Sequence, residues 1–217
     1  MANNSIPEVI LVGINQNNRS IELDVFWSEN GKKFKNHLFE EIVPFINSNY
    51  STSDFNTIIG HSDGAEYNHL LMLEKNNPFK GFINISTNLN NDVSTEIENF
   101  FRTQKKETFH YFISNGKYDS EDRIQAGNKI DSLHKISRNI KIHFLKKDFR
   151  ADHQNLVSKS LFDGISFVFH EYRNLDRYLN FKEYSQNYQT KINQLYGFIP
   201  NLDENDITQV LFERIKC

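Results

Sequence analysis

Residues 60–64, with the sequence Gly-His-Ser-Asp-Gly, carry the strongest chemical signal in the chain. They match the pattern G-x-S-x-G and stand between a short β-branched run, Thr57–Ile59, and an amphipathic stretch, Ala65–Leu73. In that setting a chain turns sharply from strand to helix and holds the serine hydroxyl exposed in a strained backbone conformation. Ser62 is therefore a candidate nucleophile, and the N–H of Asp63 at the helix start is a candidate oxyanion donor.

A serine hydroxyl needs a neighbouring base to become a good nucleophile, and the sequence offers 8 histidines. Only His153 lies in a loop directly after a strand-like run, within residues 147–153. We therefore expect His153 to be the general base. The other histidines fall in helical patterns, in strand-like runs or in the turn itself, where packing is the simpler role: His37, His61, His69, His110, His134, His143 and His170.

A carboxylate that orients the base should follow the preceding strand. Asp119 comes after the run Phe109–Ile113, where the chain passes from loop to helix, and it is our first choice, with helix capping as its competing role. Asp122 falls in the first helical turn, where acids are favoured by the helix dipole alone. The pattern leaves the choice between these two acids open. The chain order is then nucleophile, acid and base, as Ser62, Asp119 and His153.

Short apolar runs rich in β-branched and aromatic residues alternate with longer amphipathic stretches along the first three quarters of the chain. This alternation predicts an α/β fold, with a mostly parallel sheet of about five strands between two layers of helices. Because ligands of such sheets bind at the carboxyl ends of the strands, the loops named above should meet there. The predicted strands are Val9–Ile14, Thr57–Ile59, Phe82–Ile85, Phe109–Ile113 and Ile140–Leu145. The predicted helices are residues 34–46 with a kink at Pro44, Ala65–Leu73, Val93–Phe101 starting near Ser94 or Thr95, Ser120–Ile136 and Leu156–Phe169.

The pattern changes near residue 174, after which no strand signal is found. We predict one α/β domain over residues 1–173 and a helical extension over residues 174–217. The extension shows two weakly amphipathic stretches, Phe181–Leu195 and Asp203–Ile215.

Charge and composition exclude several classes of function. The net charge of −3 argues against a nucleic-acid binder that relies on a broad positive field. The single cysteine excludes an internal disulfide or thiolate cluster, and no H-E-x-x-H motif is present, so no metal or organic cofactor is expected. No apolar run approaches the roughly 20 residues of a membrane helix, and no export signal is visible. We therefore expect a cytoplasmic protein without a membrane partner.

Several stretches together resemble the family of α/β hydrolases that includes esterase D-type enzymes and trilactone siderophore esterases. They cover nearly the whole chain. The stretches are Glu8–Ile14 with Arg19, Phe39–Ile46 with Tyr50, Thr57–Ser62, Asp152–His153 with Ser160–Gly164, and Tyr188–Phe198. The resemblance implies a three-layer α/β-hydrolase-like fold. It also implies a serine hydrolase that cleaves small-molecule carboxylic esters through an acyl-enzyme, with no cofactor.

The resemblance has two departures. The family has Leu-Gly-Gly where this chain has Asp63-Gly64-Ala65, and a carboxylate beside the nucleophile disfavours an oxyanion unless it points away. The family also has about three strands before the one matched by Val9–Ile14, with a loop that supplies the second oxyanion donor. Either the chain is a truncated copy, or this strand pairs differently. A backbone N–H near Ile14 and Asn15 is then the candidate second donor.

An incomplete sheet has consequences for function. It would expose strand edges that favour self-association into a homo-oligomer. It also motivates an alternative function, a catalytically inactive hydrolase-like module used for binding or assembly. Arg19 has two candidate roles, bracing of its own loop or contact with an anionic substrate group, and bracing is favoured.

Overall fold

The structure is a computed structural model that describes residues 6–24, 28–172 and 184–200, together with Glu204 and Thr208. The boundary predicted at residue 174 and nearly all of the predicted helix Asp203–Ile215 lie outside these residues. None of the helices within the described ranges is long and apolar enough to cross a membrane.

The described residues form one sheet of four parallel strands. The four predicted strands from residue 57 onward are confirmed. Three of them are longer than predicted, by one to three residues at one or both ends. The last, predicted as Ile140–Leu145, starts two residues later and ends four residues later. The fifth, Val9–Ile14, is not a strand, so the prediction of about five strands is wrong by one. In order across the sheet the strands are β1 (Asn56–His61), β2 (Phe79–Ile85), β3 (Phe109–Gly116) and β4 (Ile142–Phe149).

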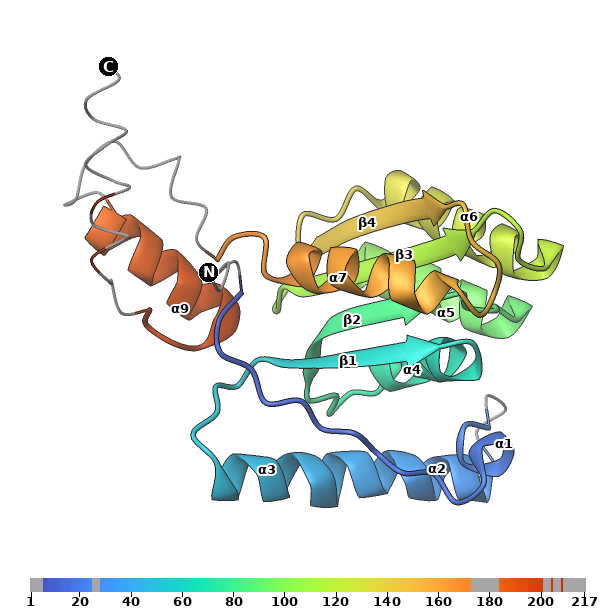
Figure 1. Ribbon diagram of the computed structural model, residues 1–217, viewed down its shortest axis with the longest axis horizontal. Coiled ribbons are helices and arrows are strands. Elements are labelled where there is room, and N and C mark those ends of the chain that lie inside the picture. The colour runs from blue at the N-terminus through green and yellow to red at the C-terminus, as the bar shows by residue number, and fades with distance from the viewer. Residues whose placement is uncertain (1–5, 25–27, 173–183, 201–203, 205–207, 209–217) are drawn as a thin grey trace.

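Helices cover both faces of this sheet, as predicted (Figure 1). Side chains alternate along each strand, so Phe82 and Tyr111 enter one apolar cluster while Ile83 and Phe112 enter another. The first cluster lies under three helices, α4 (Asp63–Leu73), α5 (Asn91–Thr103) and α6 (Glu121–Ser137). The second lies under α7 (Leu156–Val168). The predicted three-layer α/β architecture is therefore confirmed. Helix α5 starts earlier than predicted because the side chain of Asn90 caps it.

A continuous helical segment precedes the sheet and packs on the first cluster. It consists of α2 (Glu29–Asn36), a π-helical stretch, η1 (His37–Ile42), and α3 (Val43–Asn49), preceded by the short helix α1 (Arg19–Glu22). Pro44 does not end the segment. The preceding residues switch to π-type bonding, in which Val43 N–H donates to Leu38 O, and the chain continues past the proline in α3.

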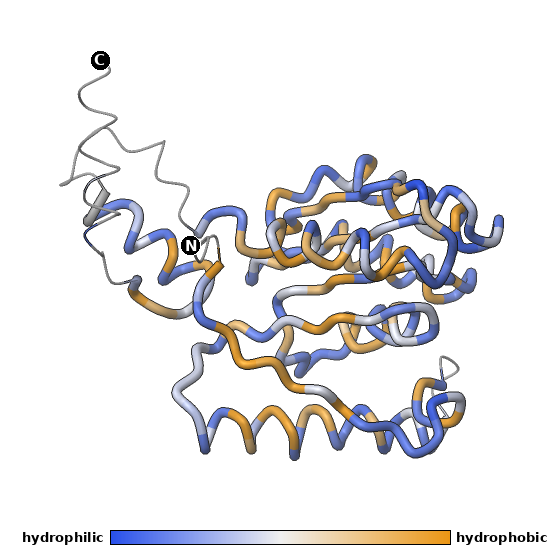
Figure 2. Tube along the Cα trace, viewed as in Figure 1, coloured by the Kyte–Doolittle hydropathy of each residue, from blue (hydrophilic) through white to orange (hydrophobic). Residues whose placement is uncertain are grey.

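The segment Val9–Ile14 runs outside the sheet without regular secondary structure. Its apolar side chains are largely exposed, up to 87% for Leu11, and they form the orange stretch of Figure 2 near the N-terminus. A β-branched run forms a strand only when a partner edge satisfies its backbone, and the sheet order leaves β1 at an edge without pairing to this segment. Among the described residues β1 therefore has a strand partner on one side only, and its residue Ile59 is 40% exposed.

The C-terminal described segment contains η3 (Tyr184–Tyr188) and α9 (Gln189–Tyr196), which confirms part of the predicted helix Phe181–Leu195. Tyr196 packs on Phe55 and Phe169 at ring distances of 5.0 and 5.5 Å. Its hydroxyl donates to Val168 O at 3.0 Å. The extension is thus attached to the end of α7 and to the segment just before β1.

Candidate active site

Ser62 occupies the sharp turn between β1 and α4. Its backbone angles, φ 60° and ψ −122°, are rare for a residue with a side chain. The turn is held from both sides, since Ser62 N–H donates to Ile85 O at 3.0 Å and Ser62 O accepts from Ala65 and Glu66 N–H at 3.0 and 3.1 Å. The predicted strand–turn–helix setting of a nucleophile elbow is therefore confirmed.

Gly60 permits the close approach that this elbow requires. A Cβ atom at residue 60 would lie 2.3 Å from Gly64 O and 2.6 Å from Ala65 N, both of which are backbone atoms. A Cβ at Gly64 would meet nothing closer than 3.9 Å. The turn therefore requires a glycine at residue 60, where the backbone of Gly64 and Ala65 leaves no room for a Cβ atom, and not at residue 64.

Replacing Gly60 by alanine is expected to lower the free energy of unfolding by about 3 kcal/mol, since backbone atoms on both sides of the turn must move. Urea denaturation of the two proteins measures this change. Gly13→Ala is the matched control, because a Cβ there has no heavy atom within 4 Å, and it should change stability by less than about 0.5 kcal/mol. Equal stability of Gly60→Ala and wild type would contradict the close approach.

His153 follows β4 and directs its Nδ1 atom toward Asp119 and Ser86. Nδ1 lies 2.8 Å from Ser86 Oγ and 3.2 and 3.3 Å from the two carboxylate oxygens of Asp119. Ser86 Oγ also forms a short hydrogen bond with Asp119 Oδ2. The loops after β2, β3 and β4 therefore meet in one polar cluster at the carboxyl edge of the sheet, as the parallel topology predicted. Asp122 is exposed in the first turn of α6, so Asp119 is the acid that contacts His153.

This cluster fixes the tautomer of His153. An ionised carboxylate only accepts hydrogen bonds, so the single proton of the Ser86 hydroxyl must go to Asp119. The remaining lone pair of Ser86 Oγ then accepts from His153 Nδ1, which must carry a proton. Nε2, on the other side of the ring, keeps its lone pair. That is the tautomer a general base requires.

Asp119 is held in its ionised form. Its side chain is only 3% exposed, and burial alone would raise the pKa of the carboxyl group. Hydrogen bonds from the Ser86 hydroxyl, the Ser120 N–H and His153 outweigh burial and leave the pKa below its ordinary value. The group can therefore stabilise a positive charge on His153 at neutral pH.

The Ser62 hydroxyl makes one long contact, 3.5 Å to Asp63 Oδ1. Within the described part of the chain, no hydrogen bond joins it to His153. A contact of this length is weak, so rotation about the Cα–Cβ bond can redirect the hydroxyl. Hydrogen bonds between nucleophile and base are often long before a substrate binds.

Two arginines surround the elbow. Arg19 Nη2 donates to His61 O at 2.8 Å, and Arg123 Nη1 donates to Ser86 O at 2.6 Å. The same guanidinium groups lie 3.8 and 3.9 Å from the Asp63 carboxylate, which is half exposed. Arg19 thus braces the turn at residue 61, not its own loop as expected, and its contact with an anionic substrate group stays a prediction. The two positive charges also offset the carboxylate that stands beside Ser62.

His61 packs beside the candidate base. Its ring lies 4.5 Å from the ring of His153, and its Nε2 donates to the main-chain oxygen of His153 at 3.0 Å. Burial first, and then the nearby His153, lower the pKa of His61, so this ring is neutral at pH 7. Because His61 is neutral, it does not repel a positive charge on the His153 ring.

Of the candidate oxyanion donors, only the N–H of Asp63 has a clear position in the structure. Asp63 opens α4, and among the described residues its N–H has no hydrogen-bond acceptor, as is usual for the first N–H groups of a helix. Ile14 and Asn15 lie on the exposed segment that leads into α1, whose Arg19 reaches the elbow. Their role as a second donor stays a prediction.

Sequence reasoning missed Ser86 and Arg123. Ser86 directly follows β2, just as Ser62 follows β1, and its φ of 55° is also positive. The rule that led to Asp119 and His153, polar residues after parallel strands, would have identified Ser86 as well. Arg123 lies in the first turn of α6 and gave no signal beyond its charge.

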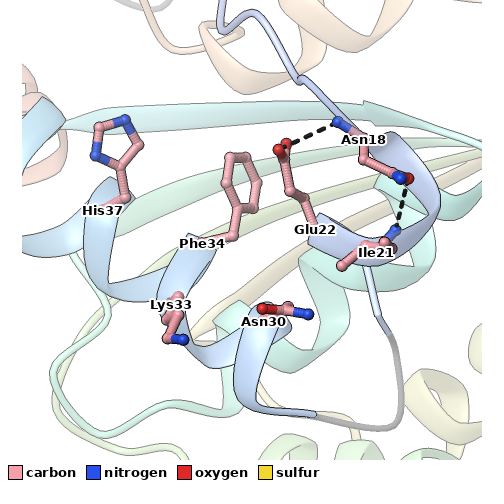
Figure 3. Close-up of a pocket in the computed structure, with 7 residues that line it drawn as sticks. All are labelled: Asn18, Ile21, Glu22, Asn30, Lys33, Phe34 and His37. Carbon is pink, nitrogen blue, oxygen red and sulfur yellow. Dashed lines mark hydrogen bonds between the residues drawn. The ribbon is translucent and has the colours of Figure 1, made fainter.

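A shallow surface pocket of about 300 Å³ lies between α1 and α2, away from this cluster (Figure 3). Its polar contacts are local, with Asn18 N–H donating to Glu22 and Ile21 N–H to the Asn18 side chain. None of the residues that line it belongs to the elbow or to the His153 cluster. We therefore place the chemistry at the carboxyl edge of the sheet.

No model of a known protein family and no curated protein matches the sequence. Several solved structures match the fold. An uncharacterised protein from Capnocytophaga ochracea has a TM-score of 0.79 at 13% identity, over 97% of this chain and 63% of that one. An IroE-like serine hydrolase from Shewanella oneidensis has a TM-score of 0.77 at 17% identity, over 97% of this chain and 78% of that one.

The siderophore hydrolase EstA from Aspergillus nidulans is a more distant match. Its TM-score is 0.51 at 16% identity, over 65% of this chain and 57% of that one. At these identities the matches establish the fold alone, which is α/β-hydrolase-like. This chain spans 63% of the length of the Capnocytophaga protein.

Proposed function

We propose that the protein is a serine hydrolase that cleaves carboxylic esters of small molecules. The observation that carries the proposal is the combination of two features at one sheet edge. Ser62 stands in a strained strand-to-helix turn, and His153 is held by Asp119 and Ser86 in the tautomer of a base. Similarity of fold to an IroE-like serine hydrolase and a siderophore hydrolase adds support.

The reaction would proceed in two halves. Nε2 of His153 takes the proton of Ser62 as Oγ attacks the ester carbonyl carbon, and the Asp119 carboxylate stabilises the imidazolium. The imidazolium then gives its proton to the departing alcohol, which leaves an acyl group on Ser62. Water, activated by the same nitrogen, hydrolyses the acyl-enzyme and restores the free hydroxyl.

The negative oxygen of each tetrahedral intermediate needs hydrogen-bond donors. The N–H of Asp63 at the start of α4 is one proposed donor, helped by the helix dipole. A backbone N–H near Ile14 or Asn15 is the proposed second. Removing one such donor typically costs about 10²–10³-fold in rate, so the second donor decides how fast the enzyme is.

A fluorophosphonate probe tests the proposal directly, because it reacts with activated serines and not with ordinary hydroxyls. Incubation of the folded protein should give one covalent adduct per chain, and peptide mass spectrometry should place it on Ser62. Protein unfolded in urea before incubation is the control and should stay unlabelled. If folded protein is not labelled, the hydrolase proposal fails and the alternative of an inactive binding or assembly module gains support. Its exposed apolar segment Val9–Ile14 already suits that alternative.

A further inference from the structure

Three histidines gather at the end of the molecule opposite Ser62. His110 and His143 are each the second residue of a strand, β3 and β4, and they face each other in the register of that parallel pair. His170 follows the end of α7. The site described above lies after the carboxyl ends of the strands, whereas this cluster lies at their amino ends. One ring nitrogen from each histidine lies within 4.8 Å of the others.

The inner two histidines have ring nitrogens without partners. His110 is fully buried, and neither Nδ1 nor Nε2 has a hydrogen-bond partner. Nδ1 of His143 is likewise buried and unpartnered. A neutral imidazole has one donor and one acceptor, and folded proteins rarely leave both unsatisfied in the interior. The rings contact edge to face, at 4.8 Å between His110 and His143, which satisfies neither nitrogen.

His170 presents the complementary arrangement. Its Nδ1 donates to Phe167 O at 2.8 Å, which leaves Nε2 as the nitrogen that could bind a metal. Metal-binding histidines are usually oriented by this kind of bond from the second ring nitrogen to a backbone carbonyl. Nε2 lies 3.3 Å from Glu171 Oε1, and Glu171 is only 9% exposed and paired with Lys191. A carboxylate that is part of an ion pair with Lys191 therefore lies beside the cluster.

Aromatic side chains enclose the inner part of the cluster. Phe55 contacts His110 edge to face at 5.6 Å, and Tyr196 of α9 stacks on it at 5.7 Å. Phe167 stacks on His170 at 5.6 Å. These rings shield the unpartnered nitrogens of His110 and His143 from water on the inner side. His170 is half exposed, so the cluster is open to solvent on that side.

We propose that His110, His143 and His170 form a binding site for a divalent transition metal, with Zn²⁺ as the best fit. Three neutral imidazoles are a common zinc ligand set, and a water molecule or the Glu171 carboxylate would complete a tetrahedron. Zinc–nitrogen bonds of about 2.0–2.1 Å place ligand nitrogens about 3.4 Å apart. The three nitrogens lie within 4.8 Å of one another, so zinc binding requires them to move closer together. The site departs from our sequence expectation that no metal is bound.

The placement indicates a structural role for this metal. It would join the amino ends of β3 and β4 to the end of α7, where the C-terminal helix α9 also packs. Nothing in the proposed hydrolysis passes through it, because the elbow lies at the other end of the strands. Loss of the metal should therefore lower thermal stability and leave labelling of Ser62 unchanged.

The test uses the full chain without an affinity tag, freed of metal by a chelator and titrated with Zn²⁺ in competition with a chromophoric chelator. One zinc should bind per chain. His143→Gln and His170→Gln should each weaken binding at least about 100-fold, since losing even the outer partners of ligands costs about 10–100-fold. His37→Gln is the matched control, because it removes an exposed histidine of η1 outside the cluster, and it should bind zinc like wild type.

A second measurement needs no variant. X-ray absorption of the zinc-loaded wild type should show three imidazole ligands, and Co²⁺ in place of zinc should give the intense visible bands of a tetrahedral site. Absence of stoichiometric zinc binding would overturn the proposal. So would zinc affinity unaffected by both cluster variants, or an absorption spectrum with fewer than three imidazoles.

Discussion

Ser62→Ala is expected to reduce kcat for hydrolysis of p-nitrophenyl acetate by about 10⁵–10⁶-fold, which is the cost of removing the nucleophile from a serine triad. The backbone of the turn should survive, since alanine lacks only the hydroxyl, which makes a single contact of 3.5 Å. Initial rates measured at saturating substrate, with circular dichroism to check folding, give the result. A residual rate within tenfold of wild type would remove Ser62 from the mechanism.

Ser86→Ala is the matched control, because Ser86 is the other serine at this sheet edge with a positive φ. Its hydroxyl is buried and turned toward His153 Nδ1 and Asp119, not toward a substrate. We expect a loss of about tenfold, the worth of one hydrogen bond of about 1.4 kcal/mol. If Ser86→Ala abolished activity and labelling while Ser62→Ala did not, the roles of the two serines would be reversed.

The elements that position the site were predictable because their signals are local. A short run rich in β-branched or aromatic residues and followed by Gly, Asn, Ser or Asp predicts both a strand and the loop after it, and this sufficed for β1, β3 and β4. Ser62, Asp119 and His153 all lie in such loops, and parallel strands bring the loops to one edge. The strained turn at Ser62 was predictable for the same reason, since Gly60 is required by the backbone of the turn itself.

The errors arose where a pattern depends on a partner far away in the chain. Val9–Ile14 has the composition of a buried strand, yet in the structure no strand edge pairs with it, and composition cannot reveal this. Ser86 could have been proposed as a polar residue after a parallel strand, but its contact with His153 depends on β2 lying between β1 and β3. His110 and His143 were assigned to packing because their meeting depends on the register of β3 with β4.

Asp119→Asn is expected to lower kcat by about 10⁴-fold, the cost seen when the acid of a serine triad loses its charge. The amide cannot stabilise the imidazolium that His153 becomes during acyl transfer. Asp122→Asn is the matched control, since Asp122 is exposed in the first turn of α6, and it should change kcat by less than about twofold. A large loss in Asp122→Asn with little in Asp119→Asn would contradict the assignment of the acid.

Ser86 allows a more specific test, because Ser86 Oγ and the Asp119 carboxylate both accept from Nδ1 of His153. In wild type the carboxylate can hold the tautomer of His153 alone, so Ser86→Ala lowers kcat by only about tenfold. In Asp119→Asn the amide can present its NH₂ group to Nδ1, and the Ser86 oxygen becomes the remaining acceptor that keeps the proton on Nδ1. Ser86→Ala should therefore cost more in the Asp119→Asn background than in wild type, which a double-mutant cycle on kcat measures. Costs that simply add would mean that Ser86 acts on Asp119 alone and that the carboxylate by itself sets the tautomer of His153.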